Sequence, residues 1–377
     1  MGPLHGIKVV ELAGIGPGPH ACAILADLGA DVIRIDRPGG QMMMTGPHDL
    51  LTRNRPSVAL NLKDPAAVET VLQLVESADV LIEGLRPGVT ERLGLGPDAV
   101  HARNPKVVYG RMTGWGQDGP LAQSAGHDIT YIATTGVLSQ LGQADKPQFP
   151  INLLGDFGGG STYLVIGILS ALLHAKTTGE GQVVDAAIVD GTAHLDLMAS
   201  GLRAMGLASQ PRGHNMLDGG APYYAIYPTS DGRHVAVGAL EPQFFDVLVD
   251  TLGVKDTCPT QYEFGRYDEM REVFAATFAS RTMAEWAEVF EGTDACVAPV
   301  LTPAEAAAHP HMSARSAYIE VNGVIQPAPA PRFSRTVPPT PTPPALVAGA
   351  DTTIALKAWG IDPEPLLASG AAVQPEA

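Results

Sequence analysis

Basic residues and cysteines are both scarce in this chain. Lysine and arginine total 24 against 40 aspartates and glutamates, which gives a formal net charge of −16. Nucleic-acid binding needs a basic surface, so this excess of acid argues against nucleic acid as a partner. The three cysteines, Cys22, Cys258 and Cys296, have neither CxxC nor metal-site spacing, and they predict no disulfide framework and no metal site. We therefore expect a cytoplasmic protein.

Long apolar runs are also missing. Residues 1–7 have neither a basic n-region nor an apolar h-region, so they predict no secretory signal. The most apolar stretch, residues 163–175, is shorter than the roughly 20 residues of a membrane-spanning helix, so we expect no membrane partner. Because this stretch lacks a polar face, it predicts a helix that is buried on all sides.

Strand and helix signals alternate in the first part of the chain. Strands are expected at 6–12, 30–36, 57–62, 79–83 and 106–112, and helices at 20–28 and 65–77. This alternation is typical of βαβ units with right-handed crossovers. It predicts an α/β fold in which residues 1–200 form a large, doubly wound parallel-sheet (Rossmann-like) domain.

The pattern changes after residue 200. Residues 201–222 are predicted to be a linker, and residues 223–320 a smaller α+β domain. In that domain we expect strands at 223–228 and 234–238, joined by a turn, and helices at 242–252, 271–279 and 283–291. Residues 321–377 predict an extended proline-rich return segment and a helix at 352–359 that packs on the large domain. The residues after 368 are expected to fray.

Three short segments each place one titratable side chain where a loop or strand enters a helix. These side chains are His127, Asp156 and Glu241. Helix starts have partial positive charge and free N–H groups, which suit a developing anion. Taken singly, each residue has an ordinary structural explanation, as an N-cap, a helix start before Pro242 or a structural histidine. Together they can form a two-base proton-transfer site.

The turn after the first strand, residues 14–19, imitates a dinucleotide fingerprint. Strand, glycine turn, helix, strand and Asp36 follow one another in the right order. However, Pro17 and Pro19 each lack a backbone N–H that phosphate binding would use, so we interpret the segment as a tight turn. Arginines at predicted strand ends or in loops are better indicators of an anionic ligand, because guanidinium groups bind phosphate in bidentate fashion. They are Arg37, Arg53, Arg55, Arg86 and Arg92.

Several motifs, in consistent order over residues 3–335, make the chain similar to the family III CoA-transferase superfamily. They include residues 9–13, 28–33, 79–83, 86–88, 92–94 and 181–185. Within that superfamily, residues 124–128, 152–160 and 238–244 resemble the α-methylacyl-CoA racemase branch, especially its bacterial type. The resemblance implies an isomerase of fatty acid and lipid metabolism whose substrate is a 2-methylacyl-CoA thioester. It also implies an interlocked homodimer and no cofactor beyond the CoA of the substrate.

The resemblance also assigns roles to particular residues. His127 stands where the racemases have a histidine base, Glu241 where the partner of that histidine lies, and Asp156 where they have the second base. In the CoA-transferase branch, an aspartate at the position of Asp156 is instead the nucleophile that takes the acyl group, which is the alternative function. That branch is not expected to have the pair of His127 and Glu241, so the racemase function is favoured.

The candidate set for binding CoA and substrate comprises the five arginines together with Ile15, Gly16, Tyr131 and Tyr224. Racemases of this branch tend to line the acyl site with many methionines. Here the region 190–213 has two, Met198 and Met205, among other apolar residues, so the preferred acyl chain stays open. The role of residues 41–44, which include three methionines, is also open.

The chemistry of a thioester explains why two different bases are needed. A thioester acidifies the hydrogen on its α-carbon, and removal of that hydrogen leaves a planar enolate. Return of a proton to the opposite face inverts the centre, so one base must stand on each face. Histidine and carboxylate can both be tuned toward neutral pH. Glu241 would orient the imidazole, and partial burial should raise the pKa of Asp156 against the effect of the helix start.

Overall fold

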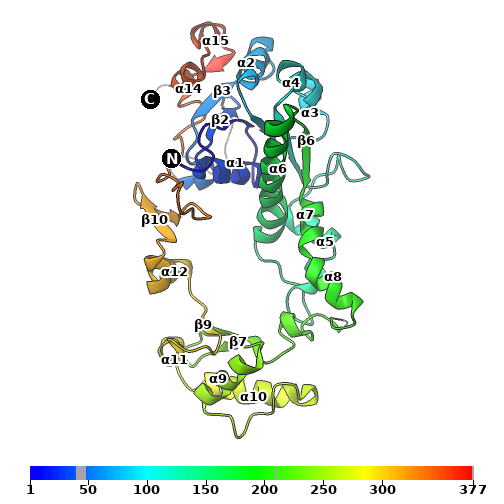
Figure 1. Cartoon of the computed structure of the whole chain (residues 1–377), viewed down its shortest axis with the longest axis vertical. Helices are drawn as coiled ribbons and strands as arrows, with labels where there is room; N and C mark the ends of the chain where they lie inside the picture. Colours follow the sequence, from blue (N-terminus) through cyan, green and yellow to red (C-terminus); the bar gives the residue numbers. More distant parts are fainter. Residues whose placement is uncertain (40–47, 209, 376–377) are drawn as a thin grey trace. The chain divides into compact units, whose positions relative to one another are not determined.

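The computed structural model describes residues 1–39, 48–208 and 210–375 (Figure 1). The chain divides into two compact units. Unit 1 comprises Met1–Thr135, Pro150–Leu195 and His311–Ala377, and unit 2 comprises Gly136–Phe149 and Asp196–Pro310. Residues 41–44, whose role the sequence leaves open, lie outside the described residues.

A seven-stranded sheet in the order β12-β3-β2-β1-β4-β5-β6 forms the centre of unit 1. Its strands are β1 (Lys8–Leu12), β2 (Asp31–Asp36), β3 (Ser57–Leu60), β4 (Val80–Glu83), β5 (Val108–Thr113), β6 (Val183–Ala187) and β12 (Ala372–Val373). All except β12 run parallel. The order 3-2-1-4-5-6 is that of the doubly wound dinucleotide-binding fold, so the predicted class of a large parallel-sheet α/β domain is confirmed.

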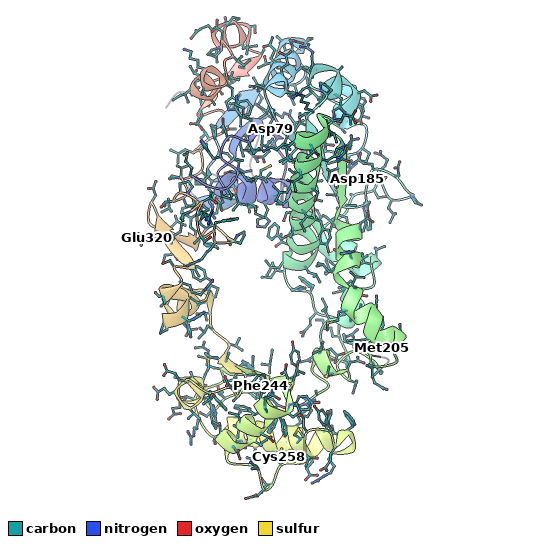
Figure 2. All side chains as sticks on the ribbon, viewed as in Figure 1. Asp79, Asp185, Met205, Phe244, Cys258 and Glu320 are labelled. Atoms are coloured by element: carbon teal, nitrogen blue, oxygen red, sulfur yellow. The ribbon has the colours of Figure 1, made fainter. Side chains whose placement is uncertain are left out.

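Strand β1 lies in the middle of the sheet, between β2 and β4. The carboxylate of Asp79, which is labelled in Figure 2, accepts a hydrogen bond from the backbone N–H of Lys8 at 2.8 Å. Alternate side chains along a strand point to opposite faces. Accordingly, Val10 belongs to one buried hydrophobic cluster and Val9 to another. The sheet therefore has a core on each face.

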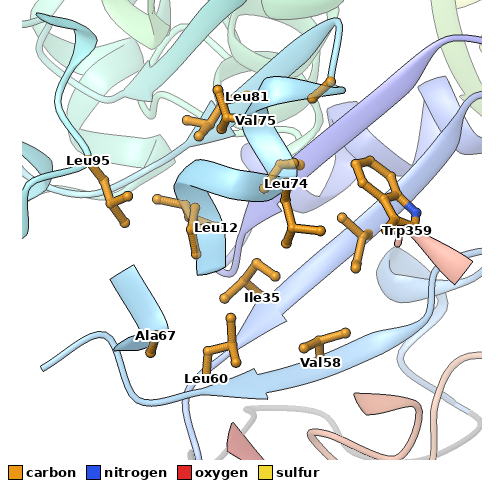
Figure 3. Close-up of a cluster of buried hydrophobic side chains, with 14 of the residues drawn as sticks. Leu12, Ile35, Val58, Leu60, Ala67, Leu74, Val75, Leu81, Leu95 and Trp359 are labelled. Atoms are coloured by element: carbon orange, nitrogen blue, oxygen red, sulfur yellow. The ribbon is translucent and has the colours of Figure 1, made fainter. Parts of the chain in front are cut away.

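Helices cover both faces of this sheet. The cluster of Val10 includes residues of α2 (Pro65–Glu76), α4 (Pro97–Arg103), α14 (Thr352–Ala358) and α15 (Glu364–Ser369). Figure 3 shows part of this cluster, in which Leu74 and Trp359 lie over sheet residues such as Ile35. The cluster of Val9 includes residues of α1 (Pro17–Asp27) and α6 (Thr162–Thr178). The other helices here are α3 (Val89–Arg92), α5 (Asp128–Thr134), α7 (Ile188–Leu195) and α13 (Pro310–Ala314).

The C-terminal residues return to the sheet of unit 1. Helix α14 matches the prediction for residues 352–359, and its Leu356 is fully buried. After α15, strand β12 pairs antiparallel with β3, and Ala371 and Ala372 are buried. The expectation of fraying is therefore wrong for residues 371–373, because this strand closes the sheet edge with backbone hydrogen bonds and buried methyl groups.

Helix α6 continues from a π-helical segment, η4 (Leu153–Ser161), which makes one helix of 26 residues, Leu153–Thr178. This is the one helix among the described residues whose length and apolar composition would allow it to cross a membrane. The core helices of soluble proteins can meet the same two criteria. The expectation that the stretch is too short is wrong, because the helix begins ten residues before position 163. Ile166 and Leu173 are 53% and 69% exposed, so the helix is not buried on all sides in this chain.

Unit 2 has a core of its own. Its antiparallel sheet has the order β7-β8-β9, with strands β7 (Tyr224–Pro228), β8 (His234–Gly238) and β9 (Val297–Pro299). Its helices are α8 (Leu197–Ala204), α9 (Pro242–Leu252), α10 (Tyr267–Phe278), α11 (Met283–Phe290) and α12 (Pro303–Ala308). The two predicted strands, their turn and the bounds of α9 agree with the structure, whereas α10 begins four residues before the predicted position 271. The smaller unit is α+β, as expected.

The bounds of the units differ from the predicted domains 1–200, 201–222, 223–320 and 321–377. Residues 136–149 group with unit 2, because the Arg212 guanidinium donates to the carbonyl oxygens of Ser139, Gln143 and Ala144. The chain returns to unit 1 at residue 311, before the hairpin of β10 (Tyr318–Val321) and β11 (Val324–Pro327). These unit bounds depend on contacts between segments far apart in sequence, and such contacts cannot be predicted from local sequence patterns.

Candidate active site

A cavity of about 1400 Å³ opens at the carboxyl ends of the parallel strands in unit 1. Its lining includes residues that follow each of these strands, namely 13–17 after β1, 37–38 after β2, 61–63 after β3, 84–87 after β4, 114–115 after β5 and Ile188 after β6. Open α/β sheets bind their ligands at this edge. The cavity is therefore the candidate substrate site, and all of its lining residues belong to unit 1.

Two of the three predicted catalytic residues line this cavity. His127 is exposed at the N-cap of α5, where its backbone N–H donates to Oγ1 of Thr130 at 3.0 Å. Asp156 is partly buried in the first turn of η4. The imidazole of His127 is close enough to act on the pKa of Asp156. The structure thus brings the two predicted bases to one cavity.

The surroundings of Asp156 raise the pKa of its carboxyl group. Burial is the largest cause, and the nearby Asp128 carboxylate acts in the same direction. A hydrogen bond from Nδ2 of Asn152 at 3.2 Å and the charge of His127 oppose this rise without reversing it. The direction agrees with the expectation from sequence. A carboxyl group that must both donate and accept a proton near neutral pH needs such a shift.

Glycines around Asp156 allow close packing of η4 against its neighbours. A Cβ atom on Gly155 would lie 2.4 Å from Oδ1 of Asp128, and one on Gly159 would lie 2.4 Å from Oγ1 of Thr192. Therefore η4 contacts α5 and α7 directly. The backbone N–H of Asp156 donates to Oδ1 of Asp128 at 2.7 Å, which anchors the segment of the predicted second base.

Ile15, Gly16 and Tyr131 also line the cavity, as three of the predicted substrate contacts. The Tyr131 ring fits closely against backbone, because a Cβ atom on Gly114 would lie only 2.0 Å from it. The edge of this ring meets Trp115 at 4.8 Å between centroids. Burial raises the pKa of Tyr131, the charge of Asp156 adds to the rise, and Arg86 opposes it.

The five arginines predicted to bind CoA fall into two groups. Arg37 and Arg86 are exposed on the cavity lining, and Arg92 is exposed in α3 away from the lining residues of the described cavity. Arg53 and Arg55 are buried and paired with carboxylates, Asp27 at 2.5 Å and Glu11 at 2.6 Å respectively. The structure does not bring Arg53 and Arg55 to the cavity. The sequence alone does not distinguish an arginine that binds a phosphate from one that pairs with a carboxylate far away in the chain, because both can follow or precede a strand.

Sequence reasoning missed several polar residues of the cavity, among them Asn61 and Lys63, which follow β3. Their position after a predicted strand was the available signal. Asp36 is 5% exposed, and its carboxylate accepts hydrogen bonds from Arg34 and Ser57. Because these bonds occupy the carboxylate of Asp36, they argue against a ribose-binding role for this residue. Among the described residues, no group of three or more His, Cys, Asp or Glu side chains is arranged to hold a metal ion.

The other two predicted site residues, Glu241 and Tyr224, belong to unit 2. Glu241 is exposed at the N-cap of α9, after a turn whose carbonyl oxygens at Ala239 and Leu240 accept from Nε2 of Gln261. Tyr224 pairs with Gly238 in the β7–β8 ladder, next to the same turn. Met198 and Met205 also belong to unit 2 and are 63% and 66% exposed (Figure 2 labels Met205).

Comparison with known proteins decides the family. The family model for CoA-transferase family III matches residues 4–352. The chain belongs to this family. It is 44% identical over 369 residues to the α-methylacyl-CoA racemase of Mus musculus, covering 97% of this chain and 95% of that protein. It is 45% identical over 336 residues to that of Homo sapiens, covering 88% and 87% respectively.

A solved structure agrees with the family III assignment. A CAIB/BAIF family protein from Brucella suis superposes with a TM-score of 0.78 at 27% sequence identity, over 94% of this chain and 99% of that chain. The resemblance that the sequence motifs indicated is thereby confirmed, both for the superfamily and for its similarity to the racemase branch.

Charge removal at the cavity should weaken CoA binding by this family III protein. We expect Arg37→Gln and Arg86→Gln each to raise the Kd for CoA about tenfold or more, since hydrogen bonds to charged groups contribute roughly 1.5–3 kcal/mol. Titration calorimetry at two salt concentrations measures the affinity and its salt dependence. Arg92→Gln, an exposed change outside the lining, is the matched control. Unchanged affinity in both cavity variants would remove the cavity as the CoA site.

The buried arginines should instead determine stability. We expect Arg55→Met to lower the free energy of unfolding by about 3–5 kcal/mol, because it leaves the carboxylate of Glu11 without one of its two partners. Urea denaturation followed by circular dichroism measures the loss. A second change, Glu11→Gln in the same chain, should recover part of it. If Arg55→Met folds with normal stability but no longer binds CoA, the structural role is refuted.

Proposed function

We propose that this protein is an isomerase that racemises 2-methylacyl-CoA thioesters, with no cofactor other than the CoA of its substrate. The observation that supports this most is the presence of His127 and Asp156 on one cavity at the ends of the parallel strands. The identity of 44–45% over most of the chain to two named α-methylacyl-CoA racemases supports the substrate class. Fatty acid and lipid metabolism, in the cytoplasm, is the proposed setting.

The proposed reaction is a 1,1-proton transfer through an enolate. One base takes the α-proton of the thioester and leaves its electron pair delocalised onto the thioester oxygen. The other base, already protonated, delivers its proton to the opposite face of the α-carbon. His127 and Asp156 exchange these roles according to the enantiomer. Glu241 is proposed to orient the imidazole of His127 and to stabilise its cation.

The developing enolate oxygen needs hydrogen-bond donors. Helices α5 and η4 both begin beside the two bases, and helix starts offer backbone N–H groups and partial positive charge. Such preorganised donors stabilise an oxyanion without reorganisation during the reaction. This arrangement supports a reaction in which the chain alone supplies the acid, the base and the donors.

A family III CoA transferase remains the second candidate, because Asp156 could act as a nucleophile. Its carboxylate would attack the thioester carbonyl, release CoA as a thiolate and hold the acyl group as an anhydride. The thiolate would next attack the Asp156 carbonyl, which releases the first acid as a carboxylate and leaves an aspartyl-CoA thioester. A second carboxylate would displace the thiolate to form a new anhydride, and attack of the thiolate on its acyl carbonyl would give the new acyl-CoA and free Asp156. The histidine on the cavity lining favours proton transfer instead, since the transferase route has no step that needs a base at His127.

Racemisation is tested by isotope exchange. We expect one enantiomer of a 2-methylacyl-CoA in deuterated water to become both racemic and deuterated at the α-carbon, as NMR can follow. Asp156→Asn and His127→Gln should each slow the reaction by about 10²–10⁴-fold. A 2,2-dimethylacyl-CoA, which has no α-hydrogen, is the control. Transfer of CoA to an added free acid, without α-exchange, would establish the transferase instead.

We propose further that the working form is a homodimer whose sites combine unit 1 of one chain with unit 2 of the other. Glu241 belongs to unit 2, whereas His127 and Asp156 belong to unit 1. The exposed Ile166 and Leu173 give α6 an uncovered apolar face, which suits contact with a second copy.

Complementation between inactive chains tests the shared site. Asp156→Asn and Glu241→Gln chains are unfolded together and refolded as a mixture, and each is also refolded alone. If the sites are shared, a mixed dimer has one site with both defects and one with neither, so racemase activity should return to about a quarter of the wild-type level. If each site comes from a single chain, activity stays at the level of the separate variants, whatever the oligomeric state.

A further inference from the structure

A histidine outside the proposed catalytic set lies against the segment that presents Asp156. His20, in α1, has its Nδ1 atom 2.6 Å from Oγ of Ser161. Its ring lies 4.3 Å from the ring of Phe157, between centroids, at an angle of 36°. Phe157 directly follows Asp156 and lines the cavity, while Ser161 is fully buried. His20 thus contacts two residues of the π-helical segment that includes the second base.

The hydrogen-bond directions in this cluster follow from the distances. Oγ of Ser161 lies 2.9 Å from the carbonyl oxygen of Phe157. Two oxygens this close repel unless a hydrogen lies between them, so the hydroxyl of Ser161 donates to Phe157. The hydroxyl has only one hydrogen, so Oγ of Ser161 must act as the acceptor in its hydrogen bond with His20. Nδ1 of His20 accordingly has the proton, and a relay runs from His20 through Ser161 to the Phe157 carbonyl.

The Phe157 carbonyl needs such support because of its place in the helix. It accepts the backbone N–H of Thr162, five residues on, which is the wide spacing of a π-helix. It also accepts from Oγ1 of Thr162 at 3.0 Å. π-Helical turns are rare and occur mostly as single turns at functional sites. Side-chain donors to this carbonyl therefore help to stabilise the π-helical turn against the tighter spacing of an ordinary α-helix.

Helix α1 lies next to the Asp156 carboxylate and also contacts the residues that follow Asp156 in η4. A Cβ atom on Gly16 would lie 3.6 Å from Oδ2 of Asp156, so the first turn of α1 faces the carboxylate itself. His20 lies four residues later on the same side of the helix and contacts Phe157 and Ser161. Burial lowers the pKa of His20, Asp27 opposes that effect, and Arg53 and Arg55 reinforce it. A neutral imidazole with one N–H group fits the relay.

We propose that His20 is a positioning residue for Asp156, acting through Ser161 and Phe157 on the π-helical turn. The inference rests on the proposed racemase function. Asp128 holds the backbone N–H of Asp156 from one side, and the His20 relay holds the carbonyl of the next residue from the other. A base must be placed within a fraction of an ångström to remove an α-proton efficiently, and misplacement by about 1 Å can cost 10²-fold in rate. Loss of the relay therefore acts on the chemical step and leaves CoA binding unchanged.

The test compares two substitutions at one position. His20→Phe keeps a ring against Phe157 but removes the donor, whereas His20→Asn keeps an N–H group near the place of Nδ1. We expect His20→Phe to lower kcat for racemisation by about ten- to a hundredfold, with KM within about twofold of wild type. His20→Asn should restore most of the rate. Ser161→Ala, which removes the middle of the relay, should match His20→Phe, and the double variant should lose little more.

The pH profile supplies a second readout. Displacement of Asp156 changes its burial and therefore its pKa. One limb of the plot of kcat against pH should disappear in Asp156→Asn, because that limb reports the titration of Asp156. The same limb should shift along the pH axis in His20→Phe and return to its wild-type position in His20→Asn. His101→Phe is the matched control, because Nε2 of His101 also lies within hydrogen-bond distance of a carbonyl, that of Val107, and His101 does not line the described cavity. It should lower thermal stability without a change in kcat or in the profile.

The outcomes separate this inference from the proposed function. If the wild-type protein shows no α-exchange, the proposed function fails, and the inference fails with it. If the wild type racemises while folded His20→Phe and Ser161→Ala proteins keep a normal kcat and profile, only the inference is overturned. An increase in KM at unchanged kcat, or a His20→Asn protein as slow as His20→Phe, would also overturn it.

Discussion

A buried carboxylate in the central strand is the constraint on which much of unit 1 depends. Glu11 is 1% exposed in β1, and a buried charge is costly unless it is paired. Its two oxygens meet Arg34 of β2 and Arg55, just before β3, at 2.5 and 2.6 Å. Arg34 also bonds Asp36, and Ser57 links Asp36 to the backbone N–H of Gly349 in the return segment. One ionic network thus joins β1, β2, the start of β3 and the returning chain, and two of its members, Arg34 and Asp36, line the cavity.

The same network explains why arginine was an ambiguous signal. Carboxylates and phosphates make the same demand on a guanidinium group, namely paired oxygen acceptors in one plane. Arg53 meets that demand inside the protein through both oxygens of Asp27, and Arg55 is paired with Glu11 through one nitrogen. Arg37 and Arg86, in contrast, are exposed at the cavity. Only burial distinguishes the two cases, and burial depends on which segments the fold brings together. The sequence therefore predicts that arginines gather at the sheet edge, but not which of them face a ligand.

Local patterns account for the parts of the structure that were predicted well. Strands β1 to β5, the β7–β8 hairpin and the bounds of α9 follow from alternation, turn residues and a proline at a helix start, whereas β6 was not predicted. Two of the differences concern distant contacts: β12 pairs with a strand over 300 residues away, and residues 136–149 group with unit 2. The two proposed bases in unit 1, His127 and Asp156, were recognisable as motifs. The glycines that let η4 contact α5 and α7 were visible in sequence, but their reason lies in tertiary packing.

The electrostatics of Asp156 bear on the choice between the two candidate reactions. A nucleophilic carboxylate must be ionised, so an environment that lowers its pKa favours acyl transfer. Burial and the charge of Asp128 instead raise the pKa of Asp156, and they outweigh Asn152 and His127. This direction is opposite to the one that a nucleophilic carboxylate needs. It is the direction needed by a residue that donates a proton to one face of an enolate and accepts one from the reverse substrate. Asp128 thus acts on Asp156 in two ways: its carboxylate accepts the backbone N–H of Asp156, and its charge contributes to the rise in the pKa of Asp156.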